Sequence, residues 1–310
     1  MAHKTLVGGT AYDVTGGKTL VNGTVYNITG GKTLVGGTAY DISFGSQGAD
    51  GGWPADLYTG LEFVSANPFT ISVTYPQWDG TLEYTNGSGW GTWGGGEISS
   101  GESSIGQCIY IRGTKNTKIT YVGLQNAWTL NGTDIQCNGN IENLLDYPTV
   151  KAGEHPAMGK YCCCGMFYNC TSITTAPTLP AAMLSDSCYD TMFRGCTSLT
   201  TGPSLPATVL SNGCYTNMFV DCISLTTIPI LPATALTRYC YQSMFSGCKK
   251  IKLSSTATGT YNKPYRIPHS GTGTTDTNSL VSMFANTGGT YTGWGYINTT
   301  YYVDESNTIV

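Results

Sequence analysis

The stretch from Cys162 to Leu236 decides the fold, and it reads CCCGMFYNCTSITTAPTLPAAMLSDSCYDTMFRGCTSLTTGPSLPATVLSNGCYTNMFVDCISLTTIPILPATAL. A Met-Phe pair recurs in it, and once beyond it, with a period of 26 residues. The pairs are Met166-Phe167, Met192-Phe193, Met218-Phe219 and Met244-Phe245. An apolar pattern with a fixed period of about 20 to 50 residues predicts a solenoid, because each unit buries its apolar face only by stacking on the next.

Cysteines form two further rows of this repeat. One row is Cys162, Cys188, Cys214 and Cys240, and the other is Cys170, Cys196, Cys222 and Cys248. Equivalent positions of stacked coils lie ~4.8 Å apart and point the same way, whereas a disulfide needs Cβ atoms ~3.8 Å apart on converging vectors. We therefore expect reduced, buried thiols that pack as small hydrophobic groups. A metal site can be drawn on Cys162, Cys163, Cys164 and Cys170, but zinc sites take paired ligands such as C-x2-C from two loops, so no metal and no cofactor are expected.

These units resemble BspA-type leucine-rich repeats in their Phe-x-x-Cys-x-x-Leu core and the Leu-Pro that follows it. The resemblance extends from about Asn140 to the C-terminus, so residues 140–310 are expected to form the solenoid with a polar C-terminal cap, INTTYYVDESNTIV. GNIENLLDYPTVKAGEHPAM and WDGTLEY also resemble the N-terminal flanks of such repeat proteins in gut bacteria and their phages. The family implies adhesion or recognition and carries no catalytic residues.

The N-terminal segment, residues 1–45, repeats with a period of 14 residues as KTLVGGTAYDVTGG, KTLVNGTVYNITGG and KTLVGGTAYDISFG. Each copy contains Gly-Gly or Asn-Gly between two short runs, which is typical of a β-hairpin turn. Turns at those pairs place Lys4 opposite Asp13, Lys18 opposite Asn27 and Lys32 opposite Asp41. A lone hairpin is marginally stable in water, so this segment is either a glycine-rich tether or a β-meander that anchors or oligomerises the chain. The repeats resemble those near the start of tail-associated proteins in phages and prophages of Gram-positive bacteria.

Between these units, residues 46–139 are expected to form a linker, to about Ala66, and then a small antiparallel β-sandwich or barrel. Alternating runs predict its strands: FTISVTY, GTLEYTN, QCIYIRG, TKITYVG, AWTLNG and DIQCNG. Turn signals such as Asn86-Gly87 and Asn138-Gly139 bound many of them. The chain as a whole is thus predicted to be mainly β.

Composition narrows the function. Only 11% of the residues are charged and the net charge is -4, with no basic cluster, so a nucleic-acid partner is not expected. No run of ~18 apolar residues predicts insertion in a membrane. The start, MAHKTLVGGTAYDV, lacks the ~7 to 15 apolar residues of a signal peptide, so we expect the chain to stay where it is made until something larger releases it.

Catalysis is not expected, because the three histidines, His3, His155 and His269, lie in no recognisable catalytic motif. A glycan-cleaving carboxylate pair remains open, although no spacing singles out two residues. The candidates are Glu83, Glu97, Glu102, Asp134 and Asp146.

Candidate contact residues come from two places. Trp90 and Trp93 lie in the turn-rich segment NGSGWGTWGGG, where a tryptophan either completes the core or contacts a partner. In the solenoid, the positions that differ between repeats, including Tyr168, Arg194, Val220 and Ser246, are expected to be exposed, as solvated surface or as a contact face. The tyrosine row Tyr189, Tyr215 and Tyr241 is open to the same two interpretations.

These observations favour a structural protein of a phage virion, as a tail or head fibre or a decoration subunit. It is expected to be a homo-oligomer, with a trimer favoured by analogy with fibres, and to contact other virion proteins through residues 1–45. The repeats are expected to adhere to a bacterial surface glycan or protein. The alternatives are a bacterial cell-surface adhesin and a fibre-borne glycan hydrolase.

Overall fold

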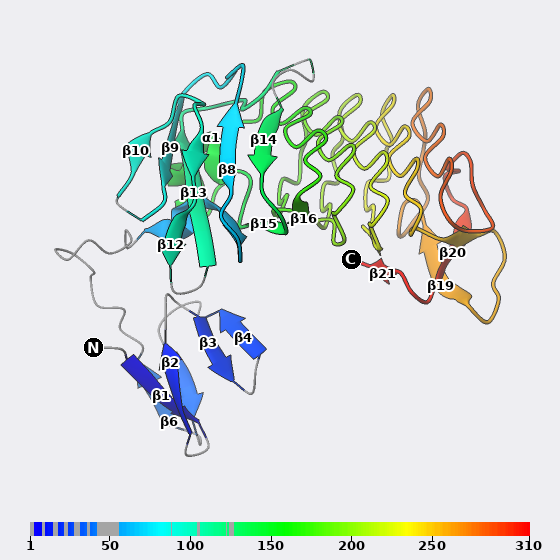
Figure 1. Cartoon of the computed structure of the whole chain (residues 1–310). Coiled ribbons are helices and arrows are strands. Elements are labelled where there is room, and N and C mark those ends of the chain that lie inside the picture. The colour runs from blue at the N-terminus through cyan, green and yellow to red at the C-terminus, as the bar shows by residue number, and fades with distance from the viewer. Residues whose placement is uncertain are drawn as a thin grey trace.

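The computed structural model describes residues 3–7, 10–14, 18–21, 24–27, 32–35, 38–41, 56–87, 89–103, 106–121, 123 and 127–310. The chain is mainly β, with several small sheets and one α-helix in this described part (Figure 1). In the N-terminal segment three hairpins pair β1 (His3–Val7) with β2 (Thr10–Val14), β3 (Lys18–Val21) with β4 (Thr24–Asn27), and β5 (Lys32–Val35) with β6 (Thr38–Asp41). Lys4 pairs with Asp13, Lys18 with Asn27 and Lys32 with Asp41, so the predicted register is confirmed.

Two sheets follow. The larger sheet has the order β10 (Gly91–Thr92), β9 (Thr81–Thr85), β13 (Gly106–Thr114), β7 (Leu61–Ser65), β15 (Ile135–Asn138) and β16 (Ile173–Thr175), and β12 (Gly101–Ser103) pairs with β13. The smaller sheet has the order β11 (Ile98–Ser99), β8 (Thr70–Val73) and β14 (Trp128–Asn131). The sheets meet where Phe63 of β7 stacks on Trp128 of β14, with ring centroids 6.0 Å apart. Alternating buried and half-buried residues along β7 match a strand with one face on the core. Neither sheet closes into a barrel.

Three details of this region differ from prediction. The segment expected to be a linker, up to Ala66, contains β7, which lies between β13 and β15, because Leu61, Phe63 and Ser65 alternate into the core. The predicted strand TKITYVG does not form in its described part; instead, the backbone N–H groups of Ile119 and Thr120 donate to the carbonyl of Cys162. The sheet is also not wholly antiparallel, since β15 and β16 run parallel.

The helix α1 (Asn143–Lys151) was not predicted. It is short, contains Pro148 and is kinked at Asp146, whose φ of -154° and ψ of 88° are not helical. Such an interrupted segment offers little of the 3.6-residue periodicity that reveals a helix in sequence.

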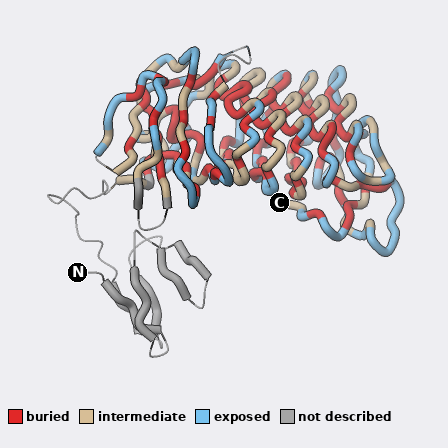
Figure 2. Tube along the Cα trace, viewed as in Figure 1, coloured by how far each residue is buried: buried red, intermediate tan, exposed pale blue. Residues whose placement is uncertain are grey.

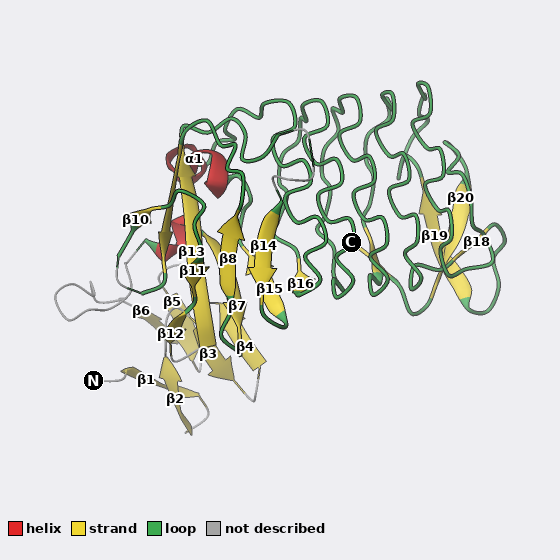
Figure 3. Cartoon of the chain, turned by 45° about the horizontal axis from the view of Figure 1, so that its top comes forward, coloured by secondary structure: helices red, strands yellow, loops and turns green. Residues whose placement is uncertain are grey.

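Between Tyr161 and Gly295, apart from the segment that carries β18 (Leu253–Ser254) and β19 (Tyr261–Arg266), the repeats lie side by side as successive turns of chain, which we call the stacked region (Figures 1 and 3). Backbone N–H groups of one repeat donate to carbonyls of the next, and the same donor–acceptor pair recurs from repeat to repeat. Examples are Phe167 to Met192, Phe193 to Met218 and Phe219 to Met244, at 2.9 to 3.0 Å. The intervening residues donate three residues back within their own repeat, as Cys196 does to Phe193. The backbone polar groups are thereby satisfied without long strands.

A positive φ recurs every four residues in each repeat. One repeat has it at Tyr161, Gly165 and Asn169, the next at Ser187, Thr191 and Gly195, and the third at Gly213, Asn217 and Asp221. Gly, Asn and Asp predominate because these residues tolerate the left-handed region best. The repeats therefore turn at fixed positions.

An aromatic column runs through the stacked region. Phe167, Phe193, Phe219, Phe245 and Phe284 stack with centroids 5.5 to 6.0 Å apart and rings within 12° of parallel. Edge-on rings close both ends, Trp128 at 6.3 Å from Phe167 and Tyr301 at 5.4 Å from Phe284. The Met and Cys rows beside it are buried as well, and Figure 2 shows this interior in red. The thiols of Cys196, Cys222 and Cys248 each donate to the carbonyl of a phenylalanine in the preceding repeat, at 2.9 to 3.0 Å.

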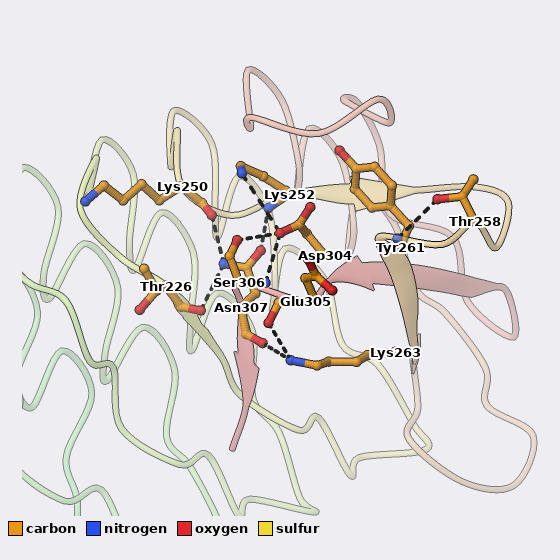
Figure 4. A network of polar contacts seen from close by, with 10 residues as sticks. All are labelled: Thr226, Lys250, Lys252, Thr258, Tyr261, Lys263, Asp304, Glu305, Ser306 and Asn307. Atoms are coloured by element: carbon orange, nitrogen blue, oxygen red, sulfur yellow. Dashed lines mark hydrogen bonds and ion pairs between the residues drawn. The ribbon is translucent and has the colours of Figure 1, made fainter.

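The C-terminal segment closes the far end. β18 (Leu253–Ser254), β20 (Thr300–Asp304) and β19 (Tyr261–Arg266) form one sheet, and β21 (Thr308–Ile309) pairs in parallel with β17 (Thr227–Ile228). The expected polar cap is thus partly apolar, because Tyr301 and Val303 are buried. Asn307 fixes this segment: its fully buried amide donates to the carbonyls of Thr226 and Lys250 and accepts from the N–H of Lys252 (Figure 4).

Candidate contact surfaces

The tyrosine row of the stacked region is internal. Tyr189, Tyr215 and Tyr241 are at most 1% exposed and stack on one another at 5.8 Å, so the prediction that they form a contact surface was wrong. Burial raises the pKa of all three hydroxyls. The hydroxyls of Tyr189 and Tyr215 make no hydrogen bond, which is rare for buried polar groups.

Two variable positions lie between the Phe and the Cys of each repeat. Their first members, Tyr168, Arg194, Val220 and Ser246, are all half-buried, so they reach the surface with part of each side chain. Their second members are Asn169, Gly195, Asp221 and Gly247, each with a positive φ. The backbone therefore restricts the residue types at this second position; Asn169 and Asp221 are exposed, as predicted, whereas Gly195 is half-buried and Gly247 is buried. One row of four residues remains as a candidate contact edge.

The two tryptophans of the glycine-rich turn have different environments. Trp93 is buried against Trp128 at 5.1 Å and Trp78 at 5.6 Å, so it belongs to the core. Trp90 is half-buried, and its ring faces the Arg112 guanidinium at 3.9 Å. The core alternative is thus confirmed for Trp93, whereas Trp90 is held against Arg112 with part of its side chain at the surface.

Trp90 is held in place by its contact with the Arg112 guanidinium. The Arg112 side chain, 8% exposed, donates to Glu83 at 2.9 Å, to Asp56 at 2.5 Å and to the hydroxyl of Thr59 at 3.0 Å, and Tyr147 covers its other face at 4.2 Å. Although burial raises the pKa of Asp56, hydrogen bonds from Trp90 and Arg112 lower it overall. The cluster is fully engaged in holding β13, β9 and the 3-10 turn Leu57–Thr59 together.

A shallow hollow of about 260 Å³ lies beside α1, lined by Lys115, Asn116, Thr117, Asp146, Thr149, His155, Pro156 and Ala157. His155, which lines the hollow, places its Nδ1 at 2.8 and 3.0 Å from the two carboxylate oxygens of Glu142, a side chain that is only 1% exposed. Asp146 accepts from the N–H of Lys115 and the hydroxyl of Thr149. Burial raises the pKa of Asp146 and these hydrogen bonds lower it, so that it stays below its usual value. The sequence did not reveal the Glu142–His155 pair, because the two residues share no motif.

Among the described side chains, no contact joins two of the carboxylates considered for glycan cleavage. Glu83 binds Arg112, Asp146 binds Lys115 and Thr149, and Glu97 accepts from Thr70. Asp134 is exposed on a turn with a φ of 50°, and the side chain of Glu102 lies outside the described residues.

The thiols offer no reactive nucleophile. All twelve cysteines are free and buried, and burial raises the pKa of Cys170 and Cys222 to about 12. Among the described residues no three His, Cys, Asp or Glu side chains come together as metal ligands. In the same residues no helix is long and apolar enough to cross a membrane.

Several exposed apolar side chains were not singled out from the sequence. Met183 and Val209 occupy equivalent positions of adjacent repeats and are 69% and 53% exposed. At the C-terminal end, Trp294 and Tyr296 are each 54% exposed. Their sequence, Thr-Gly-Trp-Gly-Tyr, offers a signal: glycine on both sides of a tryptophan leaves the ring without large neighbours along the chain.

Comparison of the chain with protein-family models, with curated proteins and with solved structures finds no match.

Proposed function

We propose that this chain is a structural protein of a phage virion, a fibre or decoration subunit, which binds a bacterial surface glycan or protein rather than catalysing a reaction. In this proposal the stacked region is a BspA-like leucine-rich repeat solenoid that carries the binding surface. The two sheets before it form a sandwich that supports its first repeat. The hairpins of residues 1–45 attach the chain to other virion proteins and to further copies of itself, as a trimer.

One observation carries this proposal: the repeats share an interior and differ on the outside. The Phe and Cys rows are buried in every repeat, while the neighbouring surface positions hold tyrosine, arginine, valine and serine in turn. A rigid frame that presents varied side chains along one edge is the usual design of repeat proteins that bind a partner. The buried thiols and engaged carboxylates fit binding better than catalysis.

The experiment is immunogold electron microscopy of phage particles released from the source strain, with antibodies against residues 140–310. Regular labelling of heads or tails supports the proposal, and labelling of the bacterial surface without particles overturns it in favour of a cellular adhesin. Sedimentation equilibrium of the purified chain tests the trimer. Loss of viscosity of a host polysaccharide on incubation with the chain contradicts the non-enzymatic part.

A further inference from the structure

The C-terminal end of the stacked region carries two large aromatic side chains in one short segment. Trp294 and Tyr296 are each 54% exposed, although burying such a side chain is favourable by about 1.5 to 3 kcal/mol. Scattered exposed aromatic residues need no explanation, but two in three residues, at an end where the neighbouring Tyr301 is buried, form a local surface feature.

The backbone under these rings is fixed. Phe284 and Gly293 exchange two backbone hydrogen bonds at 2.8 and 3.1 Å, and the N–H of Gly295 donates to Leu280 at 2.9 Å. The Tyr291 hydroxyl donates to the carbonyl of Trp294 at 2.6 Å. The segment is therefore tied to the last turn of the stack on both sides of Trp294, and little backbone ordering remains to oppose binding.

The N–H of Tyr296 donates in turn to the buried Tyr301 hydroxyl at 2.8 Å, which fixes the position of the second ring.

The glycines on either side of Trp294 have different roles. A Cβ on Gly295 would lie 3.1 Å from Met283 Sδ and 3.3 Å from Leu280, so this glycine lets the backbone rest on the core. Gly293 has a φ of +150° and nothing within 4 Å of its Cβ position, so open space lies beside the indole-bearing residue. The Trp294 ring thus projects from a firmly seated backbone next to an open surface.

The segment that carries the two rings is itself uncharged. No charged residue lies between Asp276 and Asp304 in the sequence, and threonine and asparagine predominate near Trp294. Two cations contact this segment, Lys249 through the carbonyl of Asn286 and Arg266 through the side chain of Asn298. An exposed aromatic pair carried by an uncharged segment suits a ligand that has apolar C–H faces and many hydroxyls.

We propose that Trp294 and Tyr296 form a binding site for a neutral glycan, whose pyranose rings pack on the exposed aromatic faces. This inference rests on the proposed binding function and names its ligand class and its place on the chain. Aromatic side chains provide much of the binding energy at contact surfaces because they cover a large area at a small cost in conformational entropy.

The test applies the full chain, labelled with a fluorophore, to a printed array of neutral and acidic bacterial glycans. We expect saturable binding to a subset of neutral glycans, weakened at least tenfold by Trp294→Ala and severalfold by Tyr296→Ala. Tyr75→Ala is the matched control, since Tyr75 is 56% exposed elsewhere on the chain, and it should leave binding unchanged. Circular dichroism of each variant checks that the fold is retained.

Three results overturn the inference: binding to no neutral glycan, binding only to acidic glycans, or neutral binding that Trp294→Ala leaves intact. Specific loss of self-association in Trp294→Ala, with no glycan bound, would assign the surface to a second copy of the chain and would also overturn it. Immunogold electron microscopy of particles assembled with the Trp294→Ala protein separates the two proposals. These particles should still be labelled, because incorporation into a virion does not depend on this site.

Discussion

Gly247 lies directly against Asp221 of the preceding repeat: a Cβ built on Gly247 would be 2.2 Å from Asp221 Oδ1. Gly195 has the same relationship to Asn169, at 2.1 Å. The side chains of Asp221 and Asn169 thus lie over the Cα atoms of Gly247 and Gly195. Glycine is needed at Gly195 and Gly247 for space, while its freedom to adopt a positive φ is shared with the asparagine and aspartate of the same row.

Gly247→Ala is therefore expected to lower the free energy of unfolding by about 2 to 4 kcal/mol, from left-handed strain plus the clash. In an Asp221→Gly background the clash is absent and the loss should fall to about 1 to 2 kcal/mol. Urea denaturation of the four proteins measures the coupling. Gly259→Ala, where the Cβ meets nothing within 4 Å, is the control. An equal loss in both backgrounds would show that Asp221 is not involved.

Tyr215→Phe is expected to stabilise the protein by about 1 kcal/mol, because it removes a buried hydroxyl that has no hydrogen-bond partner. The matched variant is Tyr265→Phe, which removes a buried hydroxyl that donates to the carbonyl of Pro229 at 3.1 Å. That variant should lose about 0.5 to 1.5 kcal/mol. Denaturant midpoints of the two variants should move in opposite directions, and a destabilised Tyr215→Phe protein would refute the assignment.

Asn307→Ala is expected to cost about 2 to 4 kcal/mol, since it removes three hydrogen bonds made by one fully buried amide; the Thr226 carbonyl keeps the N–H of Thr308 as a partner. Hydrogen exchange should accelerate at β21 and β17 in particular. Asn262→Ala removes one hydrogen bond to Gly259 from an exposed side chain and should change stability by less than about 0.5 kcal/mol. Unchanged exchange at β21 would mean that its strand pairing holds the C-terminal segment without Asn307.

The cysteines should resist alkylation in the native protein at pH 8, because all twelve are buried, and burial raises the pKa of thiols such as Cys170 and Cys222, so that their reactive thiolate is scarce. Iodoacetamide labelling followed by mass spectrometry should modify all twelve only in denaturant. Cys164, the most exposed at 5% and with a pKa of about 12, should be labelled first on partial unfolding. Rapid native labelling of Cys222 would contradict the buried row.

Arg112→Lys is expected to cost about 2 to 3 kcal/mol, because lysine cannot bind Asp56 and Glu83 in the same geometry or stack between Trp90 and Tyr147. Arg238→Lys is the control: Arg238 also faces a ring, Tyr239 at 4.6 Å, but it is exposed, so its loss should stay below about 0.5 kcal/mol. Thermal unfolding compares the two. Similar small losses in both would mean that the cluster around Arg112 is not a source of stability.

Much of the architecture is readable from sequence where a pattern repeats. The spacing of Phe167 and Phe193 predicted that equivalent side chains meet, and the hairpin turns predicted the pairing of Lys4 with Asp13. It was harder to predict whether a residue between two rows is buried. Tyr189 follows Cys188 and both are buried, which a strict alternation of buried and exposed residues does not predict. β7 was missed because a single copy of a strand beside a glycine-rich segment carries little signal.

The contact residues were predicted less well, for a related reason. Variation between repeats was taken to mean exposure, which holds for Asn169 and Asp221, whereas Gly195 is half-buried and Gly247 is buried. All four share a positive φ, and this restricts the residue types found there. Trp294 and Tyr296 lie where the repeat is interrupted, so comparison between copies could not reveal them. Their exposure follows from the tertiary packing of the last turn, where Gly295 rests against Leu280 and Met283. No sequence motif marks that packing.

The alternation of a side chain with a bare Cα continues along the whole row, as Asn169, Gly195, Asp221, Gly247 and Asn286. Removing the repeat that carries Gly195 would bring Asn169 against Asp221, whereas removing two adjacent repeats would keep a glycine opposite each side chain. Engineering that lengthens or shortens this protein should thus add or remove repeats in pairs.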